Sequence, residues 1–259
     1  MKQPYAMVMI GLLLWWSAGC MALSPGPRLD QYVGSAAPAA SDSKNTSLSQ
    51  GGVLNAGLIV IHDATGNRAD ESVLEHSRKF LTDQSHRLIE SRLPIRLVSV
   101  LEPPQVAHSW KALELWHRQL REQRLTYALV ALFSNDQTDT PDTLLMDGSQ
   151  EGGGAMGRIL GVTTTDFALA ELAFLELTDR GLQVVARAEG RDSATLERLA
   201  NGFETNAYPS IRRSGRIARI VPPSDEAMAK DMLRGLASSD ALERAITHLE
   251  AQWKSGVGR

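Results

Sequence analysis

The single cysteine of the chain, Cys20, has the clearest chemical context of any residue in the sequence. It follows a cationic start at Lys2, an apolar run over residues 6–16 and the small residues Ser-Ala-Gly at 17–19. This order is typical of a secretory signal peptide. The apolar run is about half of the roughly 20 residues that a membrane-crossing helix needs, which disfavours an uncleaved transmembrane anchor. A lone thiol also excludes an intramolecular disulfide and a cysteine-rich zinc site.

The stretch Ser17-Ala18-Gly19-Cys20 resembles the lipobox of bacterial lipoproteins, although that family usually has Leu at the place of Ser17. The resemblance implies that Cys20 is acylated, for example with palmitate, and becomes the new amino terminus. Several acyl chains on one residue anchor firmly, because each buried methylene contributes about 0.8 kcal/mol. Met21 stands where Asp would imply inner-membrane retention, so the resemblance implies the outer membrane, at its periplasmic face or the cell surface. The alternative is a plain signal peptide that happens to precede a cysteine.

His62 and Asp63 directly follow the apolar run 58–61, which is typical of a strand buried on both faces. Ligand sites in open α/β sheets lie beyond the carboxyl ends of strands, so the pair is a candidate ligand site. A general base also needs an orienting partner and a substrate pocket. A membrane-tethered hydrolase using His62 and Asp63 is therefore kept as an alternative function, while ordinary surface or cap histidines are the favoured interpretation.

Other residue patterns lack the spacing that their chemistry requires. The histidines do not match a zinc-binding helix, and the chain contains no Gly-x-Ser-x-Gly elbow. The glycine run 152–157 lacks the Lys-Ser/Thr of a phosphate loop, and the acidic residues over 136–147 do not match a calcium loop. We therefore expect no enzyme, no metal and no cofactor. The net charge of −3 gives no reason to expect nucleic-acid binding.

The one concentrated basic stretch consists of Arg212, Arg213, Arg216 and Arg219. Arginine presents a planar fork of donors that suits phosphate and carboxylate groups. Lipid head groups, lipopolysaccharide or an acidic protein face would be suitable partners in a cell envelope. The sequence therefore makes these arginines candidate partner-binding residues, with a solvated basic loop as the alternative.

The composition along the chain divides it into four parts. Residues 1–19 are the expected signal peptide, and 20–52 are the lipidated cysteine with a flexible tether that is small, polar and proline-rich. The short patch 29–33 has residues that can still dock. Residues 53–200 form the expected α/β domain, and 201–259 an irregular segment followed by helices. At 259 residues, the chain can bury a sizeable core.

Hydrophobic periodicity predicts strands at 58–61, 95–101 and 127–133 with helices at 70–92 and 107–124 between them. Such alternation indicates parallel strands covered by helices. An acidic, glycine-rich loop is expected at 135–157, and a long hairpin turning at 179–181. Two carboxyl-terminal helices are expected to begin at 224 or 225 and at Asp240. The predicted fold is α/β: a βαβαβ unit followed by a long antiparallel hairpin in one mixed sheet, with C-terminal helices.

The lipobox, the tether, the βαβαβ unit and the hairpin ending in LTDRGLQVVARAEG together resemble envelope lipoproteins of the rhombotarget class. They also resemble periplasmic α/β domains of the curli-secretion and TolB amino-terminal type, over roughly 20–200. The resemblance implies a protein that binds envelope components, as an accessory subunit of secretion, transport or surface assembly, and supplies no catalytic residues. The remaining alternative is a pore-forming subunit inserting the hairpin 158–190, whose charged residues interrupt a lipid-facing register.

Overall fold

The computed structural model describes residues 25–34, 52–63, 71–103, 109–145, 158–179, 181–199, 209–216 and 219–255. Cys20 and most of the predicted tether lie outside these residues, as does the glycine run 152–157. The helices are α2 (Asp30–Val33), α3 (Glu71–Arg92), α4 (Ser109–Glu122) and α5 (Glu226–Ser255). The strands are β1 (Leu54–Asp63), β2 (Ile95–Leu101), β3 (Tyr127–Leu145), β4 (Arg158–Thr178), β5 (Gly181–Leu199), β6 (Ser210–Arg213) and β7 (Arg219–Ile220).

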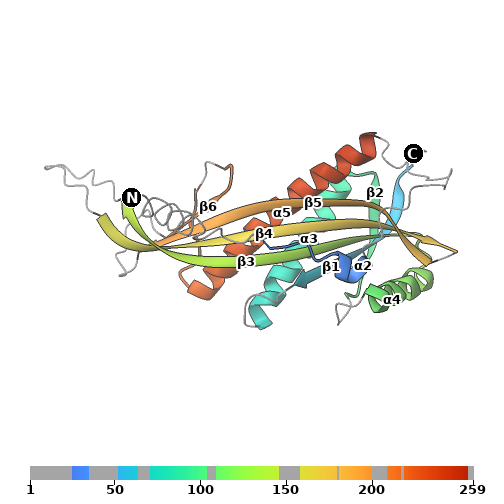
Figure 1. Ribbon diagram of the computed structural model, residues 1–259, viewed down its shortest axis with the longest axis horizontal. Helices are drawn as coiled ribbons and strands as arrows, with labels where there is room; N and C mark the ends of the chain where they lie inside the picture. Colours follow the sequence, from blue (N-terminus) through green and yellow to red (C-terminus); the bar gives the residue numbers. More distant parts are fainter. Residues whose placement is uncertain are drawn as a thin grey trace, which may run out of the picture.

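These strands form one mixed sheet in the order β2-β1-β3-β4-β5-β6-β7 (Figure 1). Strand β1 runs parallel to β2 and β3, and every pairing from β3 to β7 is antiparallel. The predicted α/β class, with a βαβαβ unit followed by a long hairpin in one mixed sheet, is confirmed. The hairpin of β4 and β5 lies inside the sheet, between β3 and β6.

Strand β3 is much longer than the sequence indicates. The predicted strand ends at Phe133, with a loop from Asn135, whereas the observed strand reaches Leu145. Residues 134–145 pair in register with β4, from Ser134 opposite Leu169 to Leu145 opposite Arg158. The loop prediction was wrong for this stretch because its polar side chains carry no apolar alternation. The stretch is held as a strand by its pairing with β4. One side-chain hydrogen bond across the pair runs from Thr164 Oγ1 to Asp139 Oδ1 at 2.5 Å.

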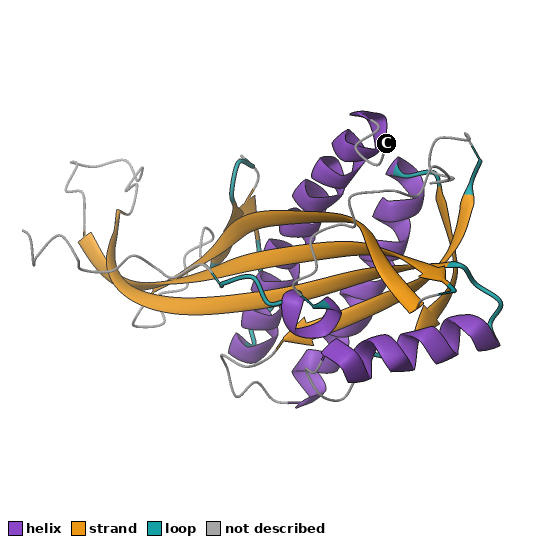
Figure 2. Ribbon diagram, turned by 45° about the vertical axis from the view of Figure 1, so that its right-hand side comes forward, coloured by secondary structure: helices purple, strands orange, loops and turns teal. Residues whose placement is uncertain are grey.

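Helices cover both faces of the sheet (Figure 2). One core lies between the sheet and the helices α3 and α5, and takes Leu58 and Val60 from β1. The second core lies on the opposite face with α2 and α4, and takes Ile59 and Ile61. Because alternate side chains of β1 enter different cores, the strand has the continuous apolar run seen in the sequence.

The carboxyl-terminal part contains one 30-residue helix, α5, where two were predicted. The predicted start is confirmed, because the Met228 N–H donates to Asp225 Oδ1 at 2.8 Å. The predicted second start at Asp240 was wrong. Asp240 lies inside the helix and pairs with Arg213 instead of capping a new helix. The preceding segment, expected to be irregular, contains the short strands β6 and β7.

Part of the predicted tether is packed against the folded body. Leu29, Tyr32 and Val33 are 4%, 7% and 4% exposed and belong to the second core, which also contains Trp116 of α4. The polar and proline-rich composition of residues 21–52 hides this docking. The predicted docking of the patch 29–33 is therefore observed. The predicted flexible tether was wrong for residues 25–34, which are packed on the domain.

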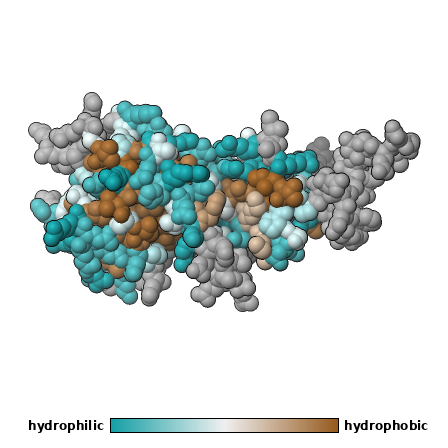
Figure 3. Space-filling model, turned by 180° about the vertical axis from the view of Figure 1, so that it is seen from behind, coloured by the Kyte–Doolittle hydropathy of each residue, from teal (hydrophilic) through white to brown (hydrophobic). Residues whose placement is uncertain are grey.

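The large apolar side chains that remain exposed lie in small groups. Val98 and Val100 are on the edge strand β2, Val221 precedes α5, and Met228 lies in its first turn; Val53 and Phe80 are exposed singly. Seen from behind, apolar patches are separated by hydrophilic surface (Figure 3). Small exposed apolar groups are ordinary on folded proteins and assign no function. None of the helices in the described part of the chain has a stretch long and apolar enough to cross a membrane.

Candidate functional site

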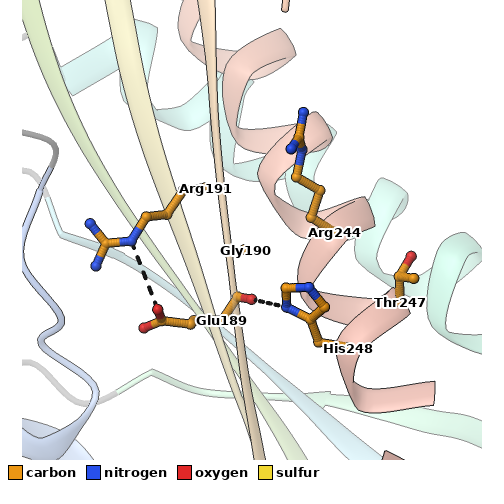
Figure 4. Close-up of a pocket in the computed structure, with 6 residues that line it drawn as sticks. All are labelled: Glu189, Gly190, Arg191, Arg244, Thr247 and His248. Carbon is orange, nitrogen blue, oxygen red and sulfur yellow. Dashed lines mark hydrogen bonds and ion pairs between the residues drawn. The ribbon is translucent and has the colours of Figure 1, made fainter. Parts of the chain in front are cut away.

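A groove lies between strand β5 and the carboxyl-terminal half of helix α5 (Figure 4). It consists of two adjoining pockets of about 370 Å³ each, which share Glu189 and His248. The first pocket is also lined by Gly190, Arg191, Arg244 and Thr247. The second is also lined by Pro27, Leu29, Asp30, Glu171, Arg187, Ala188 and Gln252. The groove therefore joins the docked amino-terminal segment to α5.

Helix α5 holds the edge of β5 through two side chains. His248 Nδ1 lies 2.7 Å from the Glu189 carbonyl oxygen, and Gln252 Nε2 donates to the Arg187 carbonyl at 2.8 Å. Residues four apart on a helix are separated by about 6 Å, and residues two apart on a strand by about 6.8 Å, so the two spacings match. A carbonyl only accepts, so His248 donates through Nδ1. In the neutral ring, Nε2 is then left as an acceptor.

The bonded carbonyls also determine what β5 presents to the groove. In an antiparallel strand the N–H and C=O of one residue point to the same side. The N–H groups of Arg187 and Glu189 therefore face the α5 side, while their carbonyls are occupied by Gln252 and His248. Addition of a complete extra strand is disfavoured here, because such a strand needs the carbonyls as well. The groove is suited to a ligand that brings hydrogen-bond acceptors.

The charged side chains of the groove do not converge on the histidine. In Figure 4, Arg191 and Arg244 point away from the His248 ring. Arg191 Nε lies 3.8 Å from Glu189 Oε1, and Arg244 Nε donates to Asp192 Oδ2 at 2.7 Å. Nucleophilic catalysis needs a nucleophile within hydrogen-bond reach of a base. The described residues of the groove show no such pair.

Three of the four arginines predicted to bind a partner are paired with acidic residues of the same chain. Arg213 donates from Nε to Asp240 Oδ2 at 2.7 Å, and the Asp240 carboxylate raises the pKa of Arg213. Arg216 lies 3.1 Å from Glu243, and Arg212 lies 3.1 Å from Glu197. Arg219 is exposed on β7 opposite Arg212. These ion pairs indicate that Arg212, Arg213 and Arg216 bind acidic groups of the same chain. The sequence does not reveal the pairs of Arg213 and Arg216, because Asp240 and Glu243 are 27 residues away from them.

Replacing Arg213 with alanine should destabilise the fold. The change leaves the Asp240 carboxylate, whose side chain is 5% exposed, without its bidentate partner. Breaking a buried pair from one side costs about 3 kcal/mol or more, and the partial exposure of Arg213 puts the loss near that lower figure. Urea unfolding measures the change, with Arg219→Ala as the control, expected within about 0.5 kcal/mol of the wild type. Equal stability of the two variants would contradict the pairing of Arg213 with Asp240.

The structure places His62 and Asp63 on opposite faces of the sheet. The His62 ring stacks on Phe133 with centroids 5.5 Å apart, on the side of the first core. Asp63 pairs with Arg28 at 2.6 Å on the other side. Burial, aided by the charges of Arg78 and Arg234, lowers the pKa of His62 to about 4. The two side chains therefore do not meet in one pocket, and a hydrolase that uses them together is not favoured.

A buried polar network at Asp166 has no signal in the sequence. Asp166 is fully buried, and burial raises the pKa of its carboxyl to about 7. Asn135 Nδ2 donates to Asp166 Oδ1 at 2.6 Å and to Ser238 Oγ at 3.0 Å. Asp166 Oδ2 has no hydrogen-bond partner within the described part of the chain. The network joins β3, β4 and α5, so only the three-dimensional arrangement shows it.

Asp166→Asn should stabilise the protein increasingly as the pH rises. The folded pKa of about 7 lies above the unfolded value of 3.8, so the carboxyl favours folding at low pH and loses that contribution as the pH rises towards 7. Asparagine keeps the acceptor for Asn135 without the charge. The gain at pH 8 is on the order of 4 kcal/mol at 1.36 kcal/mol per pKa unit, and vanishes below about pH 4. Denaturant unfolding across this range measures it, and a pH-independent difference would refute the cause.

Comparison with known proteins gives no family for the chain. No protein-family model matches it, and no curated protein matches it. Among solved structures, it is similar to a homologue of the neuraminyllactose-binding hemagglutinin from Helicobacter pylori, with a TM-score of 0.37, 12% identity, and coverage of 77% of this chain and 85% of that one. A hypothetical protein from Chlamydia trachomatis gives a TM-score of 0.35 and 9% identity over 78% of this chain and 99% of that one.

Proposed function

We propose that the protein is a bacterial lipoprotein, anchored to a membrane of the cell envelope through an acylated Cys20, and that it acts by binding. The observation that carries the anchor is the order of a cationic start, an apolar run and three small residues directly before the only cysteine. Docking of residues 25–34 on the folded body would place such an anchor beside the domain. Met21 supports the outer membrane over the inner one.

The binding half of the proposal is supported by the groove at His248. It has the size of a small ligand pocket, shows donors next to occupied acceptors, and contains no convergent acid–base pair within the described residues. A partner with exposed carboxylate or carbonyl groups fits this chemistry. We propose that the protein is an accessory subunit of an envelope secretion, transport or surface-assembly system.

Acyl labelling tests the anchor. Cells given a palmitate analogue should label the wild-type protein, and Cys20→Ala should lose both the label and the membrane association, because the chain has no other thiol. Ser17→Leu restores the usual lipobox residue and should keep the label. Label that persists in Cys20→Ala, or a wild type that never labels, would refute the anchor.

Crosslinking in the native membrane tests binding at the groove. A photo-crosslinker at Thr247, which lines the groove, should give a discrete product that weakens when Arg244→Glu reverses a neighbouring charge. The same crosslinker at Arg87 on α3 is the control for a position outside the groove. Equal capture from both positions would contradict binding at the groove. Turnover of an envelope substrate that is lost in His62→Ala would favour the hydrolase instead.

A further inference from the structure

The amino-terminal segment 25–34 is fixed to the sheet at several points. The buried carboxylate of Glu171 accepts the N–H groups of Arg28 and Leu29, at 2.7 and 3.2 Å. The Arg28 side chain pairs with Asp63 at 2.6 Å, and Arg187 binds both Asp30 and the Gly34 carbonyl. The place at which the chain leaves the folded body towards Cys20 is therefore set by the fold.

The distance from this place to the proposed anchor is short. Four residues separate Cys20 from Pro25, which is already buried. Five residue steps span at most about 18 Å when fully extended. A 32-residue tether would let the domain turn freely above a bilayer, but a span of this length holds the α2 side of the domain near the head groups.

Helix α4 lies beside α2 on that same side, and both belong to the second core. Its outer surface and the turn after it carry four exposed cations and two exposed acids, so the surface keeps a net positive charge. The cations are Lys111, Arg118, Arg121 and Arg124, and the acids are Glu114 and Glu122. Within the described residues, Arg118, Arg121 and Arg124 form no ion pair. These guanidinium groups are available to an external anion.

We propose that this basic face of α4 rests on the anionic head groups of the membrane that holds Cys20; the proposal depends on the acylation proposed above. A cationic side chain within a Debye length, about 8 Å at physiological ionic strength, is attracted by an anionic leaflet. The lipid supplies the anchor, and α4 supplies the orientation. Helix α3 then lies on the face of the sheet that is turned away from the bilayer.

Head-group quenching in vesicles tests the orientation with the acylated full chain. A dye at Glu114→Cys reports on α4, and a dye at Asp83→Cys reports on α3; both positions are exposed acids on a helix, on opposite faces of the sheet. In vesicles that contain phosphatidylglycerol and a head-group quencher, the dye on α4 should be quenched several-fold more strongly than the dye on α3. Adding Arg118→Glu and Arg121→Glu should remove most of this difference. Adding Lys79→Glu and Arg87→Glu, an equal change of charge on α3, should leave it intact.

The outcomes separate this proposal from the one on which it depends. Acylation of Cys20 with equal quenching at both dyes overturns the orientation and leaves the lipoprotein assignment standing. An unchanged difference after the α4 reversals, or an equal difference in purely zwitterionic vesicles, overturns the contact with anionic head groups. A chain without an acyl group on Cys20 overturns both proposals. Equal thermal unfolding of all labelled variants shows that the comparison is made on folded protein.

Discussion

Replacing Gly190 with alanine should be among the most destabilising single changes in the protein, with a loss of about 3 kcal/mol or more. A Cβ at this position would lie 2.1 Å from the Ala241 carbonyl oxygen and 2.4 Å from the Ala245 nitrogen. Both are backbone atoms of α5, so no side-chain rotation relieves the contact and the helix has to lift from the strand. Lifting it exposes first-core side chains such as Leu242 and Ile246, which are fully buried.

Two other glycines make a graded control for this change. Gly26→Ala adds a Cβ with nothing within 4 Å and should be nearly neutral. Gly57→Ala meets the end of the Leu101 side chain at 2.8 Å, which can shift, so its loss should be intermediate. Urea unfolding of the three variants gives the ranking. The Gly190 variant should also aggregate more readily, because lifting α5 uncovers the edge carbonyls that His248 and Gln252 hold. A neutral Gly190→Ala would show that α5 does not depend on this close approach.

The fold class follows from the sequence where local pattern and tertiary burial agree. The run 58–61 is apolar on both sides because two cores meet there, and the period of α4 places Trp116 and Leu120 on one buried face. The pattern fails where the partner of a segment lies far away in the chain. Residues 134–145 form a strand only because β4 lies beside them. In α5, the polar residues Ser238 and Asp240 can be buried because Asn135 and Arg213 bind them.

The groove is harder to predict than the fold for the same reason. His248 and Gln252 are four apart on α5, and Arg187 and Glu189 are two apart on β5, but nothing local indicates that the two spacings are matched. The docking of residues 25–34 had a weak signal in the apolar residues Leu29, Tyr32 and Val33. The exact position of this segment is set by the carboxylate of Glu171, which accepts two of its N–H groups. In the sequence alone, Glu171 is visible only as a charged residue within a predicted strand.

Replacing Glu171 with alanine should release the amino-terminal segment from the sheet. Glu171 is 5% exposed, and its carboxylate binds the N–H groups of Arg28 and Leu29. Without it, these two backbone donors lose their acceptor, at a cost of about 1–3 kcal/mol for each donor left buried and unsatisfied. The ion pairs and buried side chains of the segment offset part of this loss, so residues 25–34 should open locally more often while the main sheet stays folded. Trypsin cleavage after Arg28, followed by mass spectrometry, should become at least tenfold faster, since about 1.4 kcal/mol in the free energy of opening is a factor of ten in rate when opening and reclosing are fast relative to cleavage.

Two further variants distinguish loss of the Glu171 contact from a general destabilisation of β4. Glu171→Gln keeps an oxygen that accepts one N–H, so its cleavage rate should lie between those of the wild type and Glu171→Ala. Glu176→Ala changes a carboxylate on the same strand away from the segment and should leave cleavage after Arg28 unchanged. If cleavage after Arg28 is the same in wild type and Glu171→Ala, the segment is held by its apolar side chains and its ion pairs and not by this carboxylate. In that case Leu29→Ala should release it, and the short span to Cys20 would depend on the second core instead of on this carboxylate.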